Sequence, residues 1–289
     1  MVSTPTASPA DSGRTFLAAE PPRSPNQSLL PLTARVNDLD HLAIGGCDVP
    51  QLVEQFGSPL YILDEATLRT ACQQYRDAFA NYYAGESLVI YASKAWNCLA
   101  VCAVVQDEGL GIDVVSGGEL LTAQRASIPS DRIYFHGNNK SQAELRDGIA
   151  SGGTIVVDNW LELKTLAVLA ADASNPVRIM IRLTPGIECH THEYIKTGHI
   201  DSKFGFDPEQ LGDVFQFIRQ ASSLNCVGLH AHIGSQIFEL QPHRDLADVL
   251  VKTLQQASEY GLTITELDVG GGLGIRYTES DDPPSIEEW

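Results

Sequence analysis

The sequence predicts an α/β fold, a parallel (β/α)8 barrel of the TIM type in which seven of the eight strands are present. Three observations favour this class. Apolar runs alternate with amphipathic runs from residue 87, and the first five recur about every 20 to 25 residues, which suits a strand plus a crossover helix. The runs are rich in Val, Ile and Leu, as strands buried on both faces are. Polar or glycine residues stand at the end of nearly every run.

The seven expected strands share this apolar composition. They are Leu88–Ser93, Gly111–Val115, Ile133–His136, Thr154–Asp158, Val177–Leu183, Val227–Ile233 and Ile264–Val269. A barrel directs all its strand ends to one mouth, whereas an open sheet uses one crevice, so polar residues at so many strand ends favour the barrel. The chain stops at Trp289 without an eighth strand, which would leave two sheet edges unpaired. We therefore expect this sequence to be a fragment.

The helices between the strands carry recognisable start signals. Ser141 with Glu144, and Asn159 with Glu162, have the spacing of a capping box. Asp207, followed by a proline, predicts an N-cap and a first-turn proline. These signals place helices directly after the predicted strands, as the barrel requires.

The N-terminal part of the chain is expected to lie outside the barrel. Residues 1–38 are predicted to be a flexible leader, because their start is rich in Ser, Thr, Pro and Ala and buries too little apolar surface to offset the cost of ordering. Short strands are predicted at Leu42–Gly46 and Pro59–Asp64, and a helix at Glu65–Tyr83. The barrel domain would then cover residues 65–289.

Composition excludes several classes of protein. The net charge of −18 repels phosphate backbones, so we expect no nucleic-acid partner. No apolar run approaches the roughly 18 residues needed to span a bilayer, so no membrane partner is expected, and the N-terminus does not resemble a signal peptide. Six cysteines without a C-x-x-C pair indicate a reducing compartment, the cytoplasm.

Lys94 follows the first apolar strand of the barrel, in the stretch Tyr91–Ala95. A lysine at the mouth of a dry pocket can act as an amine nucleophile toward an aldehyde. A surface lysine that opens a loop is the alternative, and on spacing alone it is the commoner case.

Three consecutive glycines, Gly270, Gly271 and Gly272, follow the last apolar strand. Consecutive glycines let backbone N–H groups approach a phosphate closely. The stretch is not a dinucleotide fingerprint, because no G-x-G-x-x-G with an acid about 20 residues further on is present. The alternative is a tight loop without a ligand.

The pair His230 and His232 ends another strand and admits two functional interpretations. Alternate residues of a strand share a face, so the pair suits a metal, as in zinc-dependent barrel hydrolases. In the second interpretation His232 stacks on a flat cofactor and Ser235 contacts its phosphate. A buried structural histidine is the plain alternative. A metal would need further ligands, for which Asp113, Asp158 and His136 are candidates.

Taken together, these stretches resemble the pyridoxal-phosphate-dependent decarboxylases that share their fold with alanine racemase, from about Leu42 to Tyr277. Y-A-S-K-A around Lys94 is similar to the family's cofactor-lysine motif. H-A-H-I-G-S-Q from His230 and G-G-G-L-G-I from Gly270 are similar to its ring-stacking and phosphate-binding segments. R-L-T-P-G from Arg182, followed by T-H-E-Y-I-K-T-G and S-K-F-G, is most similar to the branch that acts on meso-2,6-diaminopimelate.

The resemblance implies a pyridoxal 5'-phosphate cofactor and no metal. It also implies decarboxylation of meso-2,6-diaminopimelate to L-lysine and CO2, the last step of lysine biosynthesis, by a homodimer. The expected cofactor-binding residues are Lys94 as the covalent attachment, His232 on the ring, Ser235, Gly270, Gly271 and Gly272 on the phosphate, and Asp113, His136 and Arg182 around the pocket.

The family's pattern continues beyond this sequence. Its members carry an acidic residue for the pyridine nitrogen in an E-P-G-R stretch on the eighth strand, and a cysteine and a tyrosine in a C-terminal β-domain. Residues 39–64 would be the start of that β-domain, whose C-terminal part is absent here. We therefore expect the 289-residue chain alone to be inactive, which a cofactor-dependent release of CO2 by it would contradict.

Three alternatives remain open on the sequence. One is another substrate on the same fold, as in arginine or ornithine decarboxylases or a racemase. Another is a non-catalytic barrel protein that binds pyridoxal phosphate. The third is a zinc barrel hydrolase built on His230 and His232, which metal content would distinguish from the others.

Overall fold

The computed structural model describes residues 29–187 and 203–289, which belong to two compact units, Met1–Ile62 and Leu63–Trp289. Residues 1–28 of the predicted leader lie outside the described residues. So do the T-H-E-Y-I-K-T-G stretch and Ser202. Within the described residues, no helix is both long enough and apolar enough to cross a membrane.

The first unit contains a three-stranded antiparallel sheet and one helix. The strands are β1 (Arg35–Val36), β2 (Leu42–Ile44) and β3 (Cys47–Asp48), in the order β1-β2-β3. Helix α1 (Val49–Phe56) begins where the Asp48 carboxylate accepts the Gln51 N–H at 3.0 Å. The predicted strand at Pro59–Asp64 is wrong, because this segment pairs with no described strand and instead leads into the Asp64 N-cap of the next helix.

The second unit is a curled, seven-stranded parallel sheet. Its strands are β4 (Ile90–Ala92), β5 (Gly111–Val114), β6 (Ile133–Phe135), β7 (Thr154–Val157), β8 (Val177–Arg182), β9 (Leu224–His230) and β10 (Glu266–Asp268). They pair in chain order from β4 to β10. The predicted fold class is confirmed. Strand β9 begins at Leu224, three residues before its predicted start, because Leu224 already pairs with Val177.

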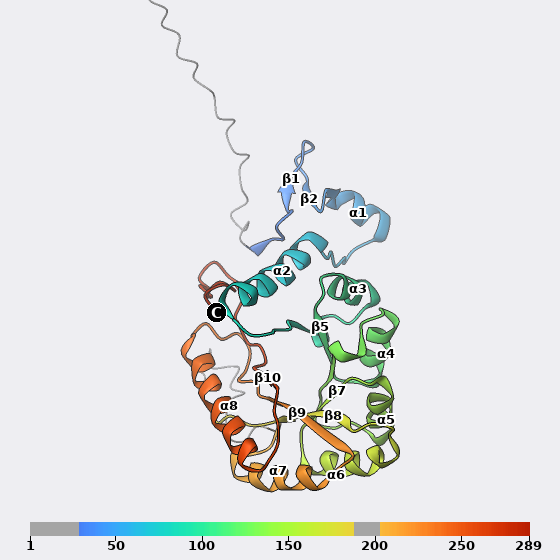
Figure 1. Ribbon diagram of the computed structural model, residues 1–289. Coiled ribbons are helices and arrows are strands. Elements are labelled where there is room, and N and C mark those ends of the chain that lie inside the picture. The colour runs from blue at the N-terminus through green and yellow to red at the C-terminus, as the bar shows by residue number, and fades with distance from the viewer. Residues whose placement is uncertain (1–28, 188–202) are drawn as a thin grey trace, which may run out of the picture. The chain divides into compact units, whose positions relative to one another are not determined.

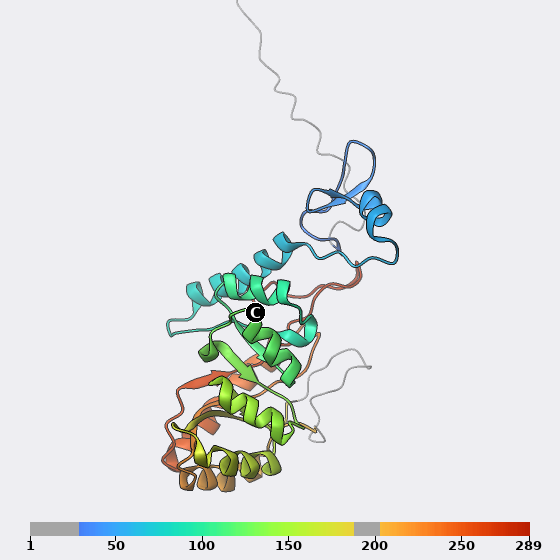
Figure 2. The same cartoon turned by 90° about the vertical axis from the view of Figure 1, so that its right-hand side faces the viewer.

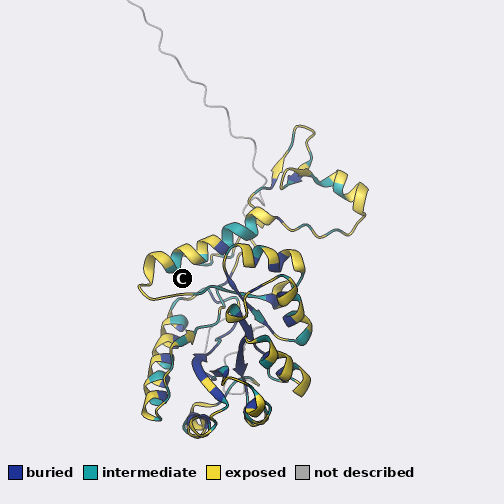
Figure 3. Cartoon of the chain, turned by 45° about the vertical axis from the view of Figure 1, so that its right-hand side comes forward, coloured by how far each residue is buried: buried dark blue, intermediate teal, exposed yellow. Residues whose placement is uncertain are grey.

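Helices cover the outer face of this sheet (Figure 1). They are α2 (Glu65–Tyr82), α3 (Leu99–Asp107), α4 (Gly117–Arg125), α5 (Gln142–Ser151), α6 (Trp160–Leu169), α7 (Leu211–Gln220) and α8 (Gln241–Glu259). Figure 2 shows the same helices from the side. In Figure 3 their outward faces are exposed while most of the strand residues are buried.

The helix start signals have mixed outcomes. The capping box of Ser141 and Glu144 forms in full at α5. At α6 only half forms: Asn159 accepts the Glu162 N–H at 3.0 Å, but the Glu162 carboxylate pairs with Lys140 instead. Asp207 makes no side-chain cap bond; it precedes a 3-10 turn, and α7 begins three residues after that turn's first residue. Spacing alone does not reveal which partner a carboxylate will take.

The sheet separates two apolar layers. Outside it, strand residues such as Ile155 and Ile179 pack with Leu163 and Phe215 of the helices. Inside it, one cluster contains residues of four strands or their starts: Tyr134, Val156, Met180 and Val227. Polar contacts also cross the interior, since the Glu266 carboxylate of β10 lies 2.5 Å from Arg178 of β8 and accepts the Tyr134 hydroxyl of β6 at 3.4 Å. These contacts require the sheet to curl.

Strands β4 and β10 form the two ends of the sheet. Among the described residues, no strand pairs with the outer edge of either. The segment after β10 packs instead against the helices that precede these strands. The Trp289 ring lies 6.0 Å from the Tyr75 ring of α2 and 5.3 Å from the His243 ring of α8.

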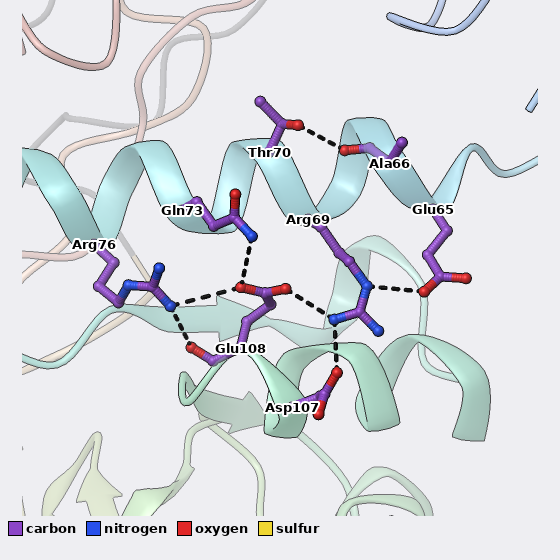
Figure 4. A network of polar contacts seen from close by, with 8 residues as sticks. All are labelled: Glu65, Ala66, Arg69, Thr70, Gln73, Arg76, Asp107 and Glu108. Carbon is purple, nitrogen blue, oxygen red and sulfur yellow. Dashed lines mark hydrogen bonds and ion pairs between the residues drawn. The ribbon is translucent and has the colours of Figure 1, made fainter.

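Helix α2 is attached to the end of α3 by a charged network (Figure 4). Arg69 donates to Glu65 at 2.8 Å, to Asp107 at 2.7 Å and to Glu108 at 2.8 Å. Arg76 donates to the Glu108 backbone carbonyl at 3.1 Å. The Arg69 guanidinium lowers the pKa of Glu108. The network therefore holds the helix before the first barrel strand against the helix that follows it.

A second ion pair is buried between the loop after β6 and the start of α6. Lys140 follows β6 and lies 2.9 Å from Glu162 in the first turn of α6, with the two side chains 1% and 4% exposed. The ammonium group also donates to the carbonyls of Gly137 at 2.6 Å and Val156 at 2.9 Å. Two carbonyl acceptors and the Glu162 carboxylate thus surround the ammonium group, which offsets part of the cost of burying the charge.

Replacement of Lys140 by alanine is expected to lower the free energy of unfolding by about 3 to 5 kcal/mol, because it leaves the Glu162 carboxylate buried without its partner. Urea unfolding at pH 7 measures this change. Lys252→Ala on the exposed face of α8 is the control and is expected to change stability by less than about 0.5 kcal/mol. Equal, small losses in both variants would contradict the assignment.

Candidate active site at the mouth of the barrel

The carboxyl ends of the strands bring ionisable side chains to one rim. Asp113 of β5 pairs in register with Ala92 of β4, two residues before Lys94. Arg182 at the end of β8 pairs with His230 at the end of β9, which in turn pairs with Asp268 of β10. Because parallel strands in register end at the same level, these side chains emerge together.

Two histidines and two carboxylates form the centre of this rim. His136 Nε2 lies 3.0 Å from Asp113 Oδ1 and 3.9 Å from Asp268 Oδ2. His230 Nδ1 lies 3.0 Å from the same Asp268 oxygen. The two imidazole rings are edge to face, with centroids 4.7 Å apart. The cluster joins residues of four strands or strand ends, so it connects both halves of the sheet.

Asp268 is the residue that the sequence analysis missed. Its second oxygen, Oδ1, accepts the Gly270 N–H at 2.8 Å, so one carboxylate contacts both the histidine and the glycine loop. Burial alone would raise the pKa of Asp268, but His230, His136 and the Gly270 N–H outweigh it and lower the pKa. The available signal was its position: an acid at the end of a strand, two residues before consecutive glycines, is placed like the other rim residues.

Arg182 lies beside Asp158, on the strand next to that of His230. Its Nη1 atom is 3.6 Å from Asp158 Oδ1, and its guanidinium carbon lies 4.5 Å from the centre of the Phe204 ring. Burial lowers the pKa of Arg182, while Asp158, Asp268 and Asp113 act in the opposite direction. The guanidinium thus offsets part of the negative charge of the three carboxylates.

His232 presents a neutral imidazole. Burial first, and then the positive charge of Lys94, lower its pKa from 6.5 to about 4. The Gly271 N–H points to its Nδ1 atom at 3.4 Å, a long hydrogen bond that an unprotonated nitrogen accepts. His230 and His232 were expected to share a strand face, but β9 ends at His230 and the two rings contact different partners.

In the glycine loop, residues 270–272, the packing of the protein leaves no room for a side chain at two positions but does at Gly271. Gly270 and Gly272 have positive φ angles of 66° and 126°. A Cβ atom on them would lie 2.7 Å from the Ala231 carbonyl oxygen and 2.6 Å from that of Gly234. A Cβ atom on Gly271 would meet nothing within 4 Å. The space above Gly271 is therefore open to a ligand.

The loops after β9 and β10 lie side by side. Ile237 N–H donates to the Gly272 carbonyl at 2.8 Å, and the Gly274 N–H returns to the Ile237 carbonyl at 2.9 Å. Gln236 and Ile275 exchange two further bonds of 2.8 Å. In the part of the chain that the structure describes, the N–H groups of residues 234, 235, 272 and 273 have no hydrogen-bond partner. Free amides on adjacent glycine-rich loops suit an anion such as phosphate.

Lys94 lies in the 3-10 turn η2 (Ser93–Ala95), directly after β4, with its side chain exposed. Its positive charge contributes to the lowered pKa of His232. An accessible primary amine and a neutral imidazole at the strand ends, with an anion site on the glycine-rich loops, suit a phosphorylated aromatic aldehyde.

The fold and this set of groups define a barrel of the pyridoxal-phosphate-binding class. Residues 65–289 match the family model described as pyridoxal-dependent decarboxylase, pyridoxal binding domain. The chain belongs to this family of pyridoxal-dependent decarboxylases.

Named relatives agree with this family. The chain is 65% identical over 285 residues to the diaminopimelate decarboxylase of Synechocystis sp., covering 96% of this chain and 61% of that protein. It is 43% identical to the diaminopimelate decarboxylase of Bacillus subtilis, over 89% of this chain and 59% of the relative. The solved structure of the M. jannaschii diaminopimelate decarboxylase in co-complex with L-lysine matches with a TM-score of 0.82 at 31% identity, covering 89% of this chain and 60% of that one.

The residues present suit pyridoxal phosphate. The structure brings the expected residues Lys94, Asp113, His136, Arg182 and His232 to one rim, and Ser235 and Gly270 to Gly272 to the adjoining loops. One expectation changes in detail, because the Gly270 N–H is already bonded to Asp268. Asp113, His136 and Asp268 also place one ligand atom each within 4.8 Å of one another, as a metal ion would need. In this structure His136 Nε2 instead pairs directly with the two carboxylates, at 3.0 and 3.9 Å.

The neutral state of His232 predicts a pH dependence of stability. Its folded pKa of about 4 lies below the unfolded 6.5, so unfolding takes up a proton in this interval. The free energy of unfolding should therefore fall as the pH drops from 6.5 to 4, by up to roughly 3 kcal/mol from this residue. Urea unfolding at both ends of the interval measures it. His232→Gln should lack this part of the slope, and an unchanged slope would contradict the assignment.

Asp268→Asn should weaken the binding of pyridoxal phosphate about tenfold or more, because it removes a charged acceptor that orients the glycine loop. Pyridoxal, which lacks the phosphate, should lose little affinity. Fluorescence titration with both ligands measures the two constants. Glu266→Gln, two residues earlier on β10 and paired with Arg178, is the matched control. Equal losses for both ligands would show that Asp268 does not act through the phosphate loop.

Proposed function

We propose that this chain is the pyridoxal-phosphate-binding part of a decarboxylase that converts meso-2,6-diaminopimelate to L-lysine and CO2. The 65% identity with the Synechocystis diaminopimelate decarboxylase, over nearly all of the chain, carries the proposal. The complex of a structural neighbour with L-lysine supports it, because lysine is the product of that reaction.

Each part of the rim has a role in this proposal. Lys94 is the residue that holds the cofactor covalently through its amine. The free amides of residues 234, 235, 272 and 273, with the Ser235 hydroxyl, bind the phosphate. When bound, pyridoxal phosphate supplies an electron sink for the negative charge left on the α-carbon as CO2 departs. The residues of the chain bind and orient it.

The other rim residues set the charge around the cofactor. His232 would contact the cofactor ring as a neutral imidazole, because burial lowers its pKa to about 4, and it would add no positive charge there. Arg182 faces Asp158 and lies near Asp113 and Asp268, which keeps the guanidinium within the pocket wall. Asp113 and His136, 3.0 Å apart, line the same wall.

The proposal extends to the whole protein. The chain spans 61% of the length of its Synechocystis relative. We propose that the protein acts in the cytoplasm as a homodimer, that residues 39–64 contribute to a β-domain separate from the barrel of residues 65–289, and that no metal takes part. Selection among diaminopimelate, ornithine and arginine then depends on the complete protein.

An absorption spectrum with added pyridoxal phosphate tests the cofactor site. A visible band that borohydride converts to a stable adduct is expected, with peptide mass spectrometry placing the added mass on Lys94. Lys94→Ala should lack the band, whereas Lys252→Ala on α8 should keep it. A folded chain without the band would remove the proposal, and bound zinc in that chain would favour the hydrolase alternative.

Turnover of three candidate substrates by the whole protein tests the proposed substrate. Release of CO2 from meso-diaminopimelate, ornithine and arginine is measured side by side in the presence of cofactor. Diaminopimelate is expected to be turned over at least about a hundredfold faster than the others, because a site whose buried polar groups lose their substrate partner discriminates at least this strongly. Preference for ornithine or arginine would keep the family and overturn the substrate.

A further inference from the structure

Ser93, the residue before Lys94, makes a contact that the proposed function does not use. Its side chain is 1% exposed, and its hydroxyl donates to Glu119 Oε2 at 2.8 Å. The same carboxylate oxygen accepts the Val115 N–H at 2.7 Å. One oxygen therefore joins the end of β4 to the end of β5.

Glu119 is placed for this contact by its helix. It lies in the first turn of α4, where its own N–H donates to the N-cap Ser116 at 3.3 Å. A capping box would return the Glu119 carboxylate to the N-cap N–H. Here the carboxylate reaches past the cap to the Val115 N–H and the Ser93 hydroxyl. The start of α4 is therefore bonded to the turn η2 that contains Ser93.

These bonds act on the turn that carries Lys94. The turn η2 has three residues, and Ser93 is the buried one, while Lys94 and Ala95 are exposed. A second bond, from the Tyr91 hydroxyl to the Trp96 carbonyl at 3.2 Å, spans the same turn. The Ser93 hydroxyl thus ties this turn to the segment after β5 through Glu119, and it belongs to the residue directly before Lys94.

We propose that Ser93 and Glu119 are positioning residues for Lys94, which set the location of its amine relative to the aldehyde of the bound cofactor. This inference rests on the proposed function. A hydrogen bond to a charged acceptor in a buried place is short and strong, so it restricts the turn more than a neutral bond would. Misplacement of a reacting group by about 1 Å is enough to slow or weaken bond formation substantially.

The test separates bond formation from phosphate binding. Lys94 joins pyridoxal phosphate when its nitrogen replaces the aldehyde oxygen, which leaves as water. Pyridoxine phosphate carries an alcohol in place of the aldehyde and binds without forming this bond. Dissociation constants for both ligands are measured by fluorescence titration, and the rate of bond formation by stopped-flow absorbance.

Ser93→Ala should raise the dissociation constant for pyridoxal phosphate about tenfold and slow the bond-forming phase by a similar factor. Its constant for pyridoxine phosphate should stay within about twofold of the wild type. Ser141→Ala is the matched control, since it removes a hydroxyl that donates to Glu144 Oε2 at the same 2.8 Å at the start of α5. That variant should bind both ligands like the wild type.

Glu119→Gln keeps the shape of the side chain and removes its charge. It should reproduce part of the Ser93→Ala effect, and the double variant should be no worse than the stronger single one, because both act through one bond. Equal weakening of both ligands, or no change in Ser93→Ala, would overturn the inference. A wild-type chain that forms no bond with pyridoxal phosphate would overturn the proposed function itself.

Discussion

The contacts of Asp268 connect most of the features at the mouth of the barrel. One carboxylate oxygen lies 3.0 Å from His230 Nδ1 and 3.9 Å from His136 Nε2, and the other accepts the Gly270 N–H at 2.8 Å. The histidines come from the ends of β6 and β9, and the glycine belongs to the loop after β10. The carboxylate therefore couples the curl of the sheet to the conformation of the loop that is suited to a phosphate. The negative charge of this buried carboxylate is offset by the same histidines and the Gly270 N–H that it contacts.

The rim as a whole follows this rule of local compensation. Lys140 faces Glu162, Arg182 faces Asp158, and two histidines face two aspartates, all at the carboxyl ends of strands or in the segments that follow them. Net charge over the chain is −18, yet the mouth contains cationic and anionic groups in contact. Pairing of this kind limits the net negative charge that an anionic cofactor meets at the mouth, since field strength at short range exceeds that of distant, screened surface charges.

Comparison of the expected and observed elements shows where local signals suffice. The apolar strands were placed well, since burial on both faces makes their composition continuous and distinctive. Full capping at Ser141 was also predictable, because both partners lie within four residues. Signals failed where a partner is remote: the Glu162 carboxylate turns to Lys140, the segment Pro59–Asp64 finds no strand to pair with, and β9 is extended at its start by its pairing with β8.

The sequence by itself predicted the α/β barrel, the order of its strands and most of the polar residues at the strand ends, because period, composition and spacing are local properties of the chain. Only the tertiary structure decided which of these residues meet. It showed that Asp268 joins the histidines to the glycine loop, that the Gly270 amide is already bonded while neighbouring amides are free, and that Glu119 contacts Ser93 across 26 residues. Such pairings depend on the register of parallel strands and on the curl of the sheet, which bring together side chains that no spacing in the sequence connects.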